Sequence, residues 1–315
     1  MIPDYATKSV HYKNTVNQIN KHLKLIGWSR LLTLLLAVFC FYQSKSQFEV
    51  LFLISGILFS TGFIFLIFYH FKVKRKLEIA STYLWLNESE DKFVRETVPY
   101  YPNGQEFTDT THPYSFDIDL FGPHSLYEHL NRTSTIIGRE KLAQALLHVK
   151  SREALAETQE AIQEVAEDLE WRQAFQVYAK LGEDTKEIRK YIENWQDSKQ
   201  SLSIFSVILS FLGPLAGLST MILFWQTENI YWFNWGVLLF LVNMLLFGLV
   251  QSNIRKEIGK TERIGAALLA YSEMLQLIEN RTWKSKLLQE IHQKVHCQFF
   301  TERIIPDLWK PRQYQ

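Results

Sequence analysis

This chain contains few cysteines and has a net charge close to zero. Only two cysteines, Cys40 and Cys297, occur among 315 residues, and they lie far apart. This spacing argues against a disulfide framework and favours a reducing compartment for the soluble part. Lysine and arginine number 34 against 33 aspartates and glutamates, so no overall charge points to nucleic acid as a partner.

Long apolar runs, by contrast, are plentiful. Each of four runs approaches or reaches the roughly 20 residues that a helix needs to cross a bilayer. Short polar connections join the first run to the second and the third to the fourth, which predicts two helical hairpins. The first run lacks a small-residue cleavage site, which argues against a cleaved signal peptide. The four predicted spans are Ile26–Tyr42, Phe48–Phe71, Leu202–Trp225 and Tyr231–Val250.

Basic residues flank these runs on one side only. The two short hairpin connections contain a single basic residue, Lys45. Because cytoplasmic flanks carry the excess of lysine and arginine, both termini and the central polar region are predicted to be cytoplasmic. The flanking basic residues on which this orientation depends include Lys72, Lys74, Arg75, Lys76, Arg255 and Lys256.

The polar region before residue 140 predicts several short elements. Residues 74–96 are expected to continue the second span as a helix. Alternating apolar side chains over Tyr114–Leu120 predict a short extended stretch, and Gly122-Pro123 is expected to begin a helix. Ser134 or Thr135 is expected to cap the next helix. Gly138, in that helix's first turn, indicates close approach of a second helix backbone.

Helices are also predicted for the rest of the polar sequence. Ser151 is expected to cap a helix that Gly182 ends, and Thr282 to cap a last helix near the C-terminus. The fold class is therefore all-α, with four transmembrane helices and cytoplasmic helical parts. The expected regions are a cytoplasmic segment 1–25, hairpin 26–71, central helical domain 72–201, hairpin 202–250 and cytoplasmic helices 251–315.

Some polar residues have the types found at metal sites. His292 and His296 lie four residues apart on one predicted helix face, next to Cys297. Zinc hydrolases with this spacing need a glutamate after the first histidine, whereas this chain has Gln293, so a solvated helix face is preferred. The Asp117-Ile-Asp119 pair is interpreted as the outward side of the extended stretch rather than as a metal site.

Two arginines beside the predicted turn at residue 133 admit two interpretations. Arg132 and Arg139 are either phosphate contacts or structural residues that cap carbonyl groups or pair with Glu128 or Glu140. The structural interpretation is preferred.

Around these arginines the sequence resembles the core, or lever, region of the DNA mismatch-repair MutS family, and more specifically its membrane-anchored bacterial members. The family pattern here joins two core helices through an Asn-Arg-Thr-x-Thr-x-x-Gly run. The close resemblance covers roughly residues 106–181, and it departs from the family at Thr158-Gln159, where Arg-Gln is usual. The matching positions are Leu130, Arg132, Thr133, Thr135, Gly138 and Leu142.

The resemblance implies a nucleotide-driven machine in which core helices transmit the state of an ATPase to a DNA clamp. The P-loop that such an ATPase carries, G-x-x-x-x-G-K-[ST], does not occur in these 315 residues. The nearest string, Gly213–Thr220, lacks the lysine and lies in a predicted span. No catalytic, cofactor or metal residue is therefore assigned. ATP and magnesium are expected only with an ATPase domain that follows in a longer protein or belongs to a separate chain, unless the engine has been lost.

The expected function is the anchor and lever of a membrane-bound MutS-like machine at the bacterial inner membrane. The lipid bilayer is its first partner, and DNA, a second copy or a separate ATPase chain are the others that the resemblance implies. The alternative is a membrane scaffold that uses its helices for protein contacts and has no nucleic-acid role.

Overall fold

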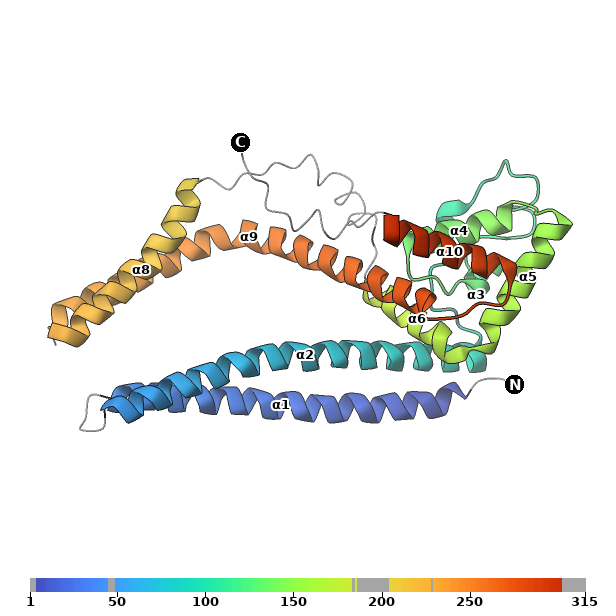
Figure 1. Ribbon diagram of the computed structural model, residues 1–315. Coiled ribbons are helices and arrows are strands. Elements are labelled where there is room, and N and C mark those ends of the chain that lie inside the picture. The colour runs from blue at the N-terminus through green and yellow to red at the C-terminus, as the bar shows by residue number, and fades with distance from the viewer. Residues whose placement is uncertain (1–3, 45–48, 183–184, 186–203, 228, 302–315) are drawn as a thin grey trace. The chain divides into compact units, whose positions relative to one another are not determined.

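The computed structural model describes residues 4–44, 49–182, 185, 204–227 and 229–301, and every regular element within them is a helix. This confirms the all-α class for the described residues. The chain divides into two compact units, residues 1–184 with 269–315 and residues 185–268. The elements, labelled in Figure 1, are α1 Tyr5–Gln43, α2 Glu49–Glu96, the short 3-10 helix η1 Gln105–Phe107, α3 Leu126–Leu130, α4 Ile136–Leu147, α5 Arg152–Glu167, α6 Leu169–Leu181, α8 Ile204–Thr227, α9 Ile230–Glu279 and α10 Lys286–Thr301.

Helices α1 and α2 form a long antiparallel hairpin (Figure 1). Near one end the rings of Tyr12 and Tyr83 stack with centroids 4.7 Å apart. Near the other end Gly56 lies so close to Phe41 that an added Cβ would come within 2.9 Å of its ring. Contacts at both ends show that the two helices pair along most of their length.

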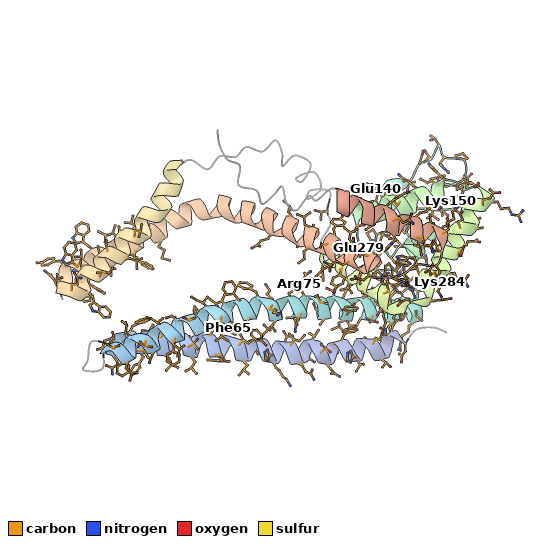
Figure 2. The ribbon with its side chains drawn as sticks, in the orientation of Figure 1. Phe65, Arg75, Glu140, Lys150, Glu279 and Lys284 are labelled. Atoms are coloured by element: carbon orange, nitrogen blue, oxygen red, sulfur yellow. The ribbon has the colours of Figure 1, made fainter. Side chains whose placement is uncertain are left out.

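The hairpin exposes many large apolar side chains. Helices α1 and α2 are both long and apolar enough to cross a membrane. Phe65, labelled in Figure 2, has 67% of its surface exposed. Exposing a continuous apolar surface to water is unfavourable, whereas lipid has no such cost. The first two predicted spans are thus confirmed as helices of sufficient length and hydropathy.

The predicted continuation of the second span as a helix through residues 74–96 is confirmed, since α2 is unbroken for 48 residues. Its last turns pack on α6 through a polar contact. Asn87 is fully buried, and its Oδ1 accepts a bond of 2.9 Å from Nε2 of the equally buried Gln173.

A small core holds α3 and α4 together. It consists of Leu120, Phe121, Tyr127 and Ala143. The Tyr127 hydroxyl donates to the carbonyl of Arg139 in α4, at 3.2 Å. Gly104 lies against this ring with φ of 71°, and a Cβ there would come within 2.6 Å of Tyr127. Both the backbone conformation and the close approach therefore require glycine.

Two local predictions before α3 are wrong. Residues 114–119 form turns rather than an extended stretch, with the amide of Ile118 donating to the carbonyl of Tyr114. Period-two alternation predicts a strand only where a neighbouring strand takes up the backbone bonds, and the described residues contain none. Gly122-Pro123 also does not begin a helix: Gly122 has φ of 106°, and α3 begins at Leu126 behind the N-cap Ser125.

The later helix boundaries are partly as predicted. Ser151 caps α5, as expected, by accepting from the amide of Ala154. The helix ends at Asp168 instead of continuing to Gly182, because the Asp168 carboxylate caps a new helix, α6, through the amide of Trp171. Thr282 is not a cap, since α10 begins only at Lys286.

The second unit contains α8 and the first part of α9. The rings of Phe224 and Phe233 pack 5.4 Å apart, and a Cβ on Gly236 would come within 3.1 Å of the Thr220 hydroxyl. Both predicted runs are helical where they are described. Within α9, the apolar stretch Ile230–Met244 is shorter than the two membrane-length helices, so four crossings stay a prediction.

Candidate functional site: the Asn131–Gly138 junction

The residues on which the resemblance rests lie in or next to the connection between α3 and α4, a segment that we call the junction, Asn131–Gly138. Leu130 ends α3 and Thr135 is the N-cap of α4. Leu142, one turn beyond the junction, packs against the core that contains Tyr127. The side chain of Leu130, in contrast, is half exposed.

Asn131 is the most deeply buried residue of the junction, with no exposed surface. Its Nδ2 donates to the carbonyl of Pro102 at 2.8 Å. Its Oδ1 accepts from the amide of Thr133 at 2.9 Å and from the Thr133 hydroxyl at 2.7 Å. A buried amide with all these bonds fixes the turn between the helices.

Arg132 links the junction to α2. Its Nε donates to Oε1 of Glu90 at 2.8 Å, and its Nη1 donates to the carbonyls of His129 and Asn131. The side chains of Arg132 and Glu90 are only 23% and 12% exposed. Carbonyl capping by Arg132 was predicted correctly, but its acidic partner is neither Glu128 nor Glu140.

Aromatic rings enclose this ion pair. The Arg132 guanidinium lies 4.4 Å from the ring centroid of Phe93 and 5.3 Å from that of Tyr100, so cation–π attraction adds to the salt bridge. The Tyr100 hydroxyl donates to Glu90. Burial, and then this bond, raises the pKa of Tyr100 above its ordinary 10.

Gly138 and Thr135 form a tight start to α4. The Thr135 hydroxyl accepts from the amide of Gly138 at 3.1 Å. A Cβ on Gly138 would come within 2.9 Å of that hydroxyl oxygen and 3.2 Å of the Thr133 Cβ. The close approach predicted for Gly138 is therefore present, but the nearest atoms belong to the junction itself and not to a second helix.

The chemistry of the junction is that of a structural joint. Each nitrogen of the Arg132 guanidinium donates to a protein oxygen: Nε and Nη2 to Glu90, Nη1 to two carbonyls. Because its nitrogens are all engaged in this way, Arg132 is unsuited to contact phosphate, which supports the structural interpretation of Arg132. Arg139 makes, among the described residues, a single ion pair, with the partly exposed Glu106 at 3.9 Å.

Only some of the candidate metal residues have described side chains, and these do not gather into a group of metal ligands. His292 Nε2 lies 3.3 Å from the carbonyl oxygen of Glu279, and the side chains of His296 and Cys297 are outside the described part. Asp117 and Asp119 are exposed on the turns before α3. Among the described residues, no group of three or more His, Cys, Asp or Glu side chains is arranged to hold a metal ion.

The basic residues after the second span separate into two kinds. Lys72, Lys74 and Lys76 are exposed. Arg75 instead donates to Glu273 in α9 at 3.1 Å. Arg255 and Lys256 lie within α9, but their side chains are outside the described part.

A second contact region, which the sequence did not predict, joins α6 to the ends of α9 and α10. Trp171 Nε1 donates to the carbonyl of Leu277 at 3.0 Å, and its ring meets Trp283 edge-on. Arg281 binds Asp168 at 2.9 Å and lies over both tryptophan rings. No local sequence signal predicts this region, because the partners are about 110 residues apart in the chain.

Glu164 of α5 completes this contact region. Its two carboxylate oxygens accept from the amides of Lys284 and Ser285, each at 2.7 Å, just before α10. Desolvation acts to raise the pKa of Glu164, but the bonds from these amides outweigh it, so the pKa is lowered. A side chain from another helix thus supplies the anion that a helix start favours.

Comparison with known proteins identifies no relative: no protein-family model, curated protein or solved structure matches the chain.

Proposed function

We propose that this chain is the anchor and lever of a membrane-bound MutS-like machine. The observation that carries the proposal is the bond between Arg132 of the family pattern and Glu90, near the end of α2. The junction residues do not form an isolated turn. They connect the helical domain, which we define as residues 97–181, directly to a helix long and apolar enough to cross a membrane.

The mechanical part of the proposal depends on the continuity of α2. Its 48 residues form one helix, about 70 Å long at 1.5 Å per residue. A continuous helix transmits tilt and rotation because its backbone bonds resist bending. Movement of α4 would therefore pass through Arg132 and Glu90 to α2, and along α2 to the membrane.

Charge argues that any DNA contact lies outside the helical domain. Residues 97–181 contain seven lysines and arginines against thirteen aspartates and glutamates. Nucleic-acid affinity depends on free cations that displace counterions from phosphates. Arg132, Arg139 and Arg172 already bind protein oxygens. We therefore assign anchoring and transmission to this chain, and ATP and DNA binding to other parts of the machine.

The proposed setting is the inner membrane of a bacterium, with four crossings in two hairpins and the polar regions in the cytoplasm. Exposed apolar side chains on α8 and α9, such as Ile222 and Phe240, support the second hairpin. The exposed lysines at 72, 74 and 76 support the orientation.

ATP photo-labelling tests the proposal. The native protein would be isolated from bacterial membranes with an antibody against residues 97–181 and labelled with azido-ATP. Label on the polypeptide that carries the epitope would place the ATPase in the same chain, and label on a stoichiometric partner would place it in a second chain. An unlabelled preparation would overturn the MutS-like proposal and favour the scaffold.

DNA binding provides the second arm of the test. The native assembly should bind mismatched or branched DNA with an affinity that falls steeply as salt rises. The 315-residue chain in nanodiscs should bind neither DNA, because its helical domain is acidic. Equal binding by the chain alone would contradict the assignment of this chain to anchoring and transmission.

A further inference from the structure

One stretch of the α1–α2 hairpin carries charge of a single sign. No aspartate or glutamate occurs between Asp4 and Glu49, or between Glu49 and Glu78. The two intervals contain ten basic residues: Lys8, Lys13, Lys21, Lys24, Arg30, Lys45, Lys72, Lys74, Arg75 and Lys76. Between residues 5 and 48 and between residues 50 and 77 every acidic or basic side chain is therefore a basic one, and the carboxylates nearest in sequence are Asp4, Glu49 and Glu78.

Pairing of the two helices brings basic residues of α1 and basic residues of α2 to the same height along the hairpin. The rings of His22 and Tyr69 lie 6.0 Å apart, with the tyrosine hydroxyl 3.4 Å from Nε2 of the histidine. Because the helices are antiparallel, the residues around His22 lie beside the residues around Tyr69, and lysines 21, 24, 72, 74 and 76 all lie within about 11 Å of this pair along the helix axes. We call the five lysines at this level the lysine collar: Lys21, Lys24, Lys72, Lys74 and Lys76.

The collar lysines point away from the protein. All five are exposed, whereas Arg75, in the middle of the same run, binds Glu78 and Glu273. The neighbouring carboxylates therefore form ion pairs with the arginine. The outward lysines keep their charge available for a ligand outside the protein.

The surface next to the collar is apolar and aromatic. Trp28, Phe68 and Phe71 are all largely exposed, within about one or two helical turns of the lysines. Aromatic rings of this kind occupy the headgroup level of membranes. From Lys24 to Tyr42 the helix rises about 27 Å at 1.5 Å per residue, close to the thickness of the hydrocarbon layer.

We propose that the lysine collar binds the headgroups of anionic phospholipids in the cytoplasmic leaflet. The ligand must present phosphate directly above an apolar layer, and a lipid headgroup does so. Lysine suits this role because its long apolar stem covers hydrocarbon while the ammonium reaches the phosphate. The inference rests on the membrane insertion of α1 and α2 contained in the proposed function, and adds the class of lipid.

Spin-labelled lipids test this directly. The 315-residue chain would be reconstituted in phosphatidylcholine vesicles, and electron paramagnetic resonance would compare its association with spin-labelled phosphatidylglycerol and phosphatidylcholine. We expect a preference of about threefold to tenfold for phosphatidylglycerol at low salt, decreasing as salt rises. An inserted protein without this preference would overturn the inference.

A matched pair of double variants identifies the residues. Lys21→Gln/Lys24→Gln should reduce the preference by at least about twofold. Lys92→Gln/Arg95→Gln removes the same charge from the exposed polar end of α2, at least about 24 Å along the helix from Lys76 and beyond the Debye length, and should leave the preference unchanged. Equal effects of the two variants would overturn the collar as the site.

Two further measurements distinguish a wrong collar from binding of free phosphate and from a chain that does not insert into the membrane. Millimolar inorganic phosphate should leave the lipid preference unchanged, and loss of the preference would show that the site binds free phosphate instead. Resistance to alkaline carbonate extraction reports insertion independently. A chain that is extracted would overturn the membrane anchor itself, and with it the collar, whereas an inserted chain without lipid preference would overturn the collar alone.

Discussion

The two ends of α2 belong to one unbroken helix but follow opposite rules. Near its start, Leu58 and Phe65 present apolar surface outward. Near its end, Asn87 is fully buried and Glu90 is nearly so, and both bind polar side chains from distant segments. One end has apolar side chains outside, and the other has polar side chains inside.

This difference indicates which surroundings suit each end of the helix. In water, apolar side chains are buried and polar ones stay outside, unless they are paired. The end with outward apolar side chains is suited to lipid, where apolar surface needs no cover. The other end is suited to a protein interior, where every buried donor and acceptor needs a partner. The boundary between them lies at the lysine collar.

The largest expected effect comes from placing a charge at the apolar end. Leu58→Asp should reduce membrane insertion by about 3 kcal/mol, because aspartate near a span centre is that unfavourable. Carbonate extraction of the expressed chain measures this. The control Lys92→Asp, at the exposed polar end of the same helix, should leave insertion unchanged. Insertion of both variants would mean that α2 does not face lipid.

Removal of the buried cation should have the next largest effect. Arg132→Met should lower the free energy of unfolding of the helical domain by about 2–4 kcal/mol, since Glu90 would stay buried without its partner. Hydrogen exchange of the α3 and α4 amides reports the loss. The double variant Glu90→Gln/Arg132→Met should recover much of the protection, and protection unchanged in Arg132→Met would contradict a structural role.

Two glycines allow a smaller, matched comparison. Gly138→Ala should destabilise α4 by about 1 kcal/mol, because the new methyl group displaces the Thr135 cap. Gly62→Ala, in the apolar part of α2, meets no atom within 4 Å and should be neutral or stabilising. Thermal unfolding of the two variants in the same detergent measures the contrast, and an equal response would mean that the junction has room for a side chain.

The smallest effect is a loss of stability in acid. The pKa of Glu164 is lowered on folding from its ordinary 4.5, so its contribution is complete above that pH and disappears as the pH falls through the folded value. The protection of the Lys284 and Ser285 amides, measured relative to their intrinsic exchange rates, should therefore fall as the pH decreases below about 4.5. Glu164→Gln should abolish this pH dependence, while retention of the dependence would assign it to another group.

Local sequence signals predicted the helices well but several boundaries poorly. Caps involve bonds within three residues, so the sequence alone predicts Ser151 and narrows the cap of α4 to Ser134 or Thr135, of which the structure has Thr135. The alternation over residues 114–120 was misleading, because a strand also needs a partner strand. The sequence predicts that the helix beginning after Ser151 ends at Gly182 rather than at Asp168. An aspartate is equally compatible with a position inside a helix and with an N-cap, so the sequence does not show the break.

The sequence by itself determined the all-α class, two helices of membrane length and the residues of the junction, since apolar run length, capping and glycine geometry are local properties. Only the tertiary structure decided what those residues bind. Arg132 lies 42 residues from Glu90 and Glu164 lies 120 residues from Lys284. Nearby acids such as Glu128 and Glu140 were equally plausible partners by spacing. Which carboxylate meets which donor depends on how the helices pack, and that is decided by the burial of side chains from the whole unit.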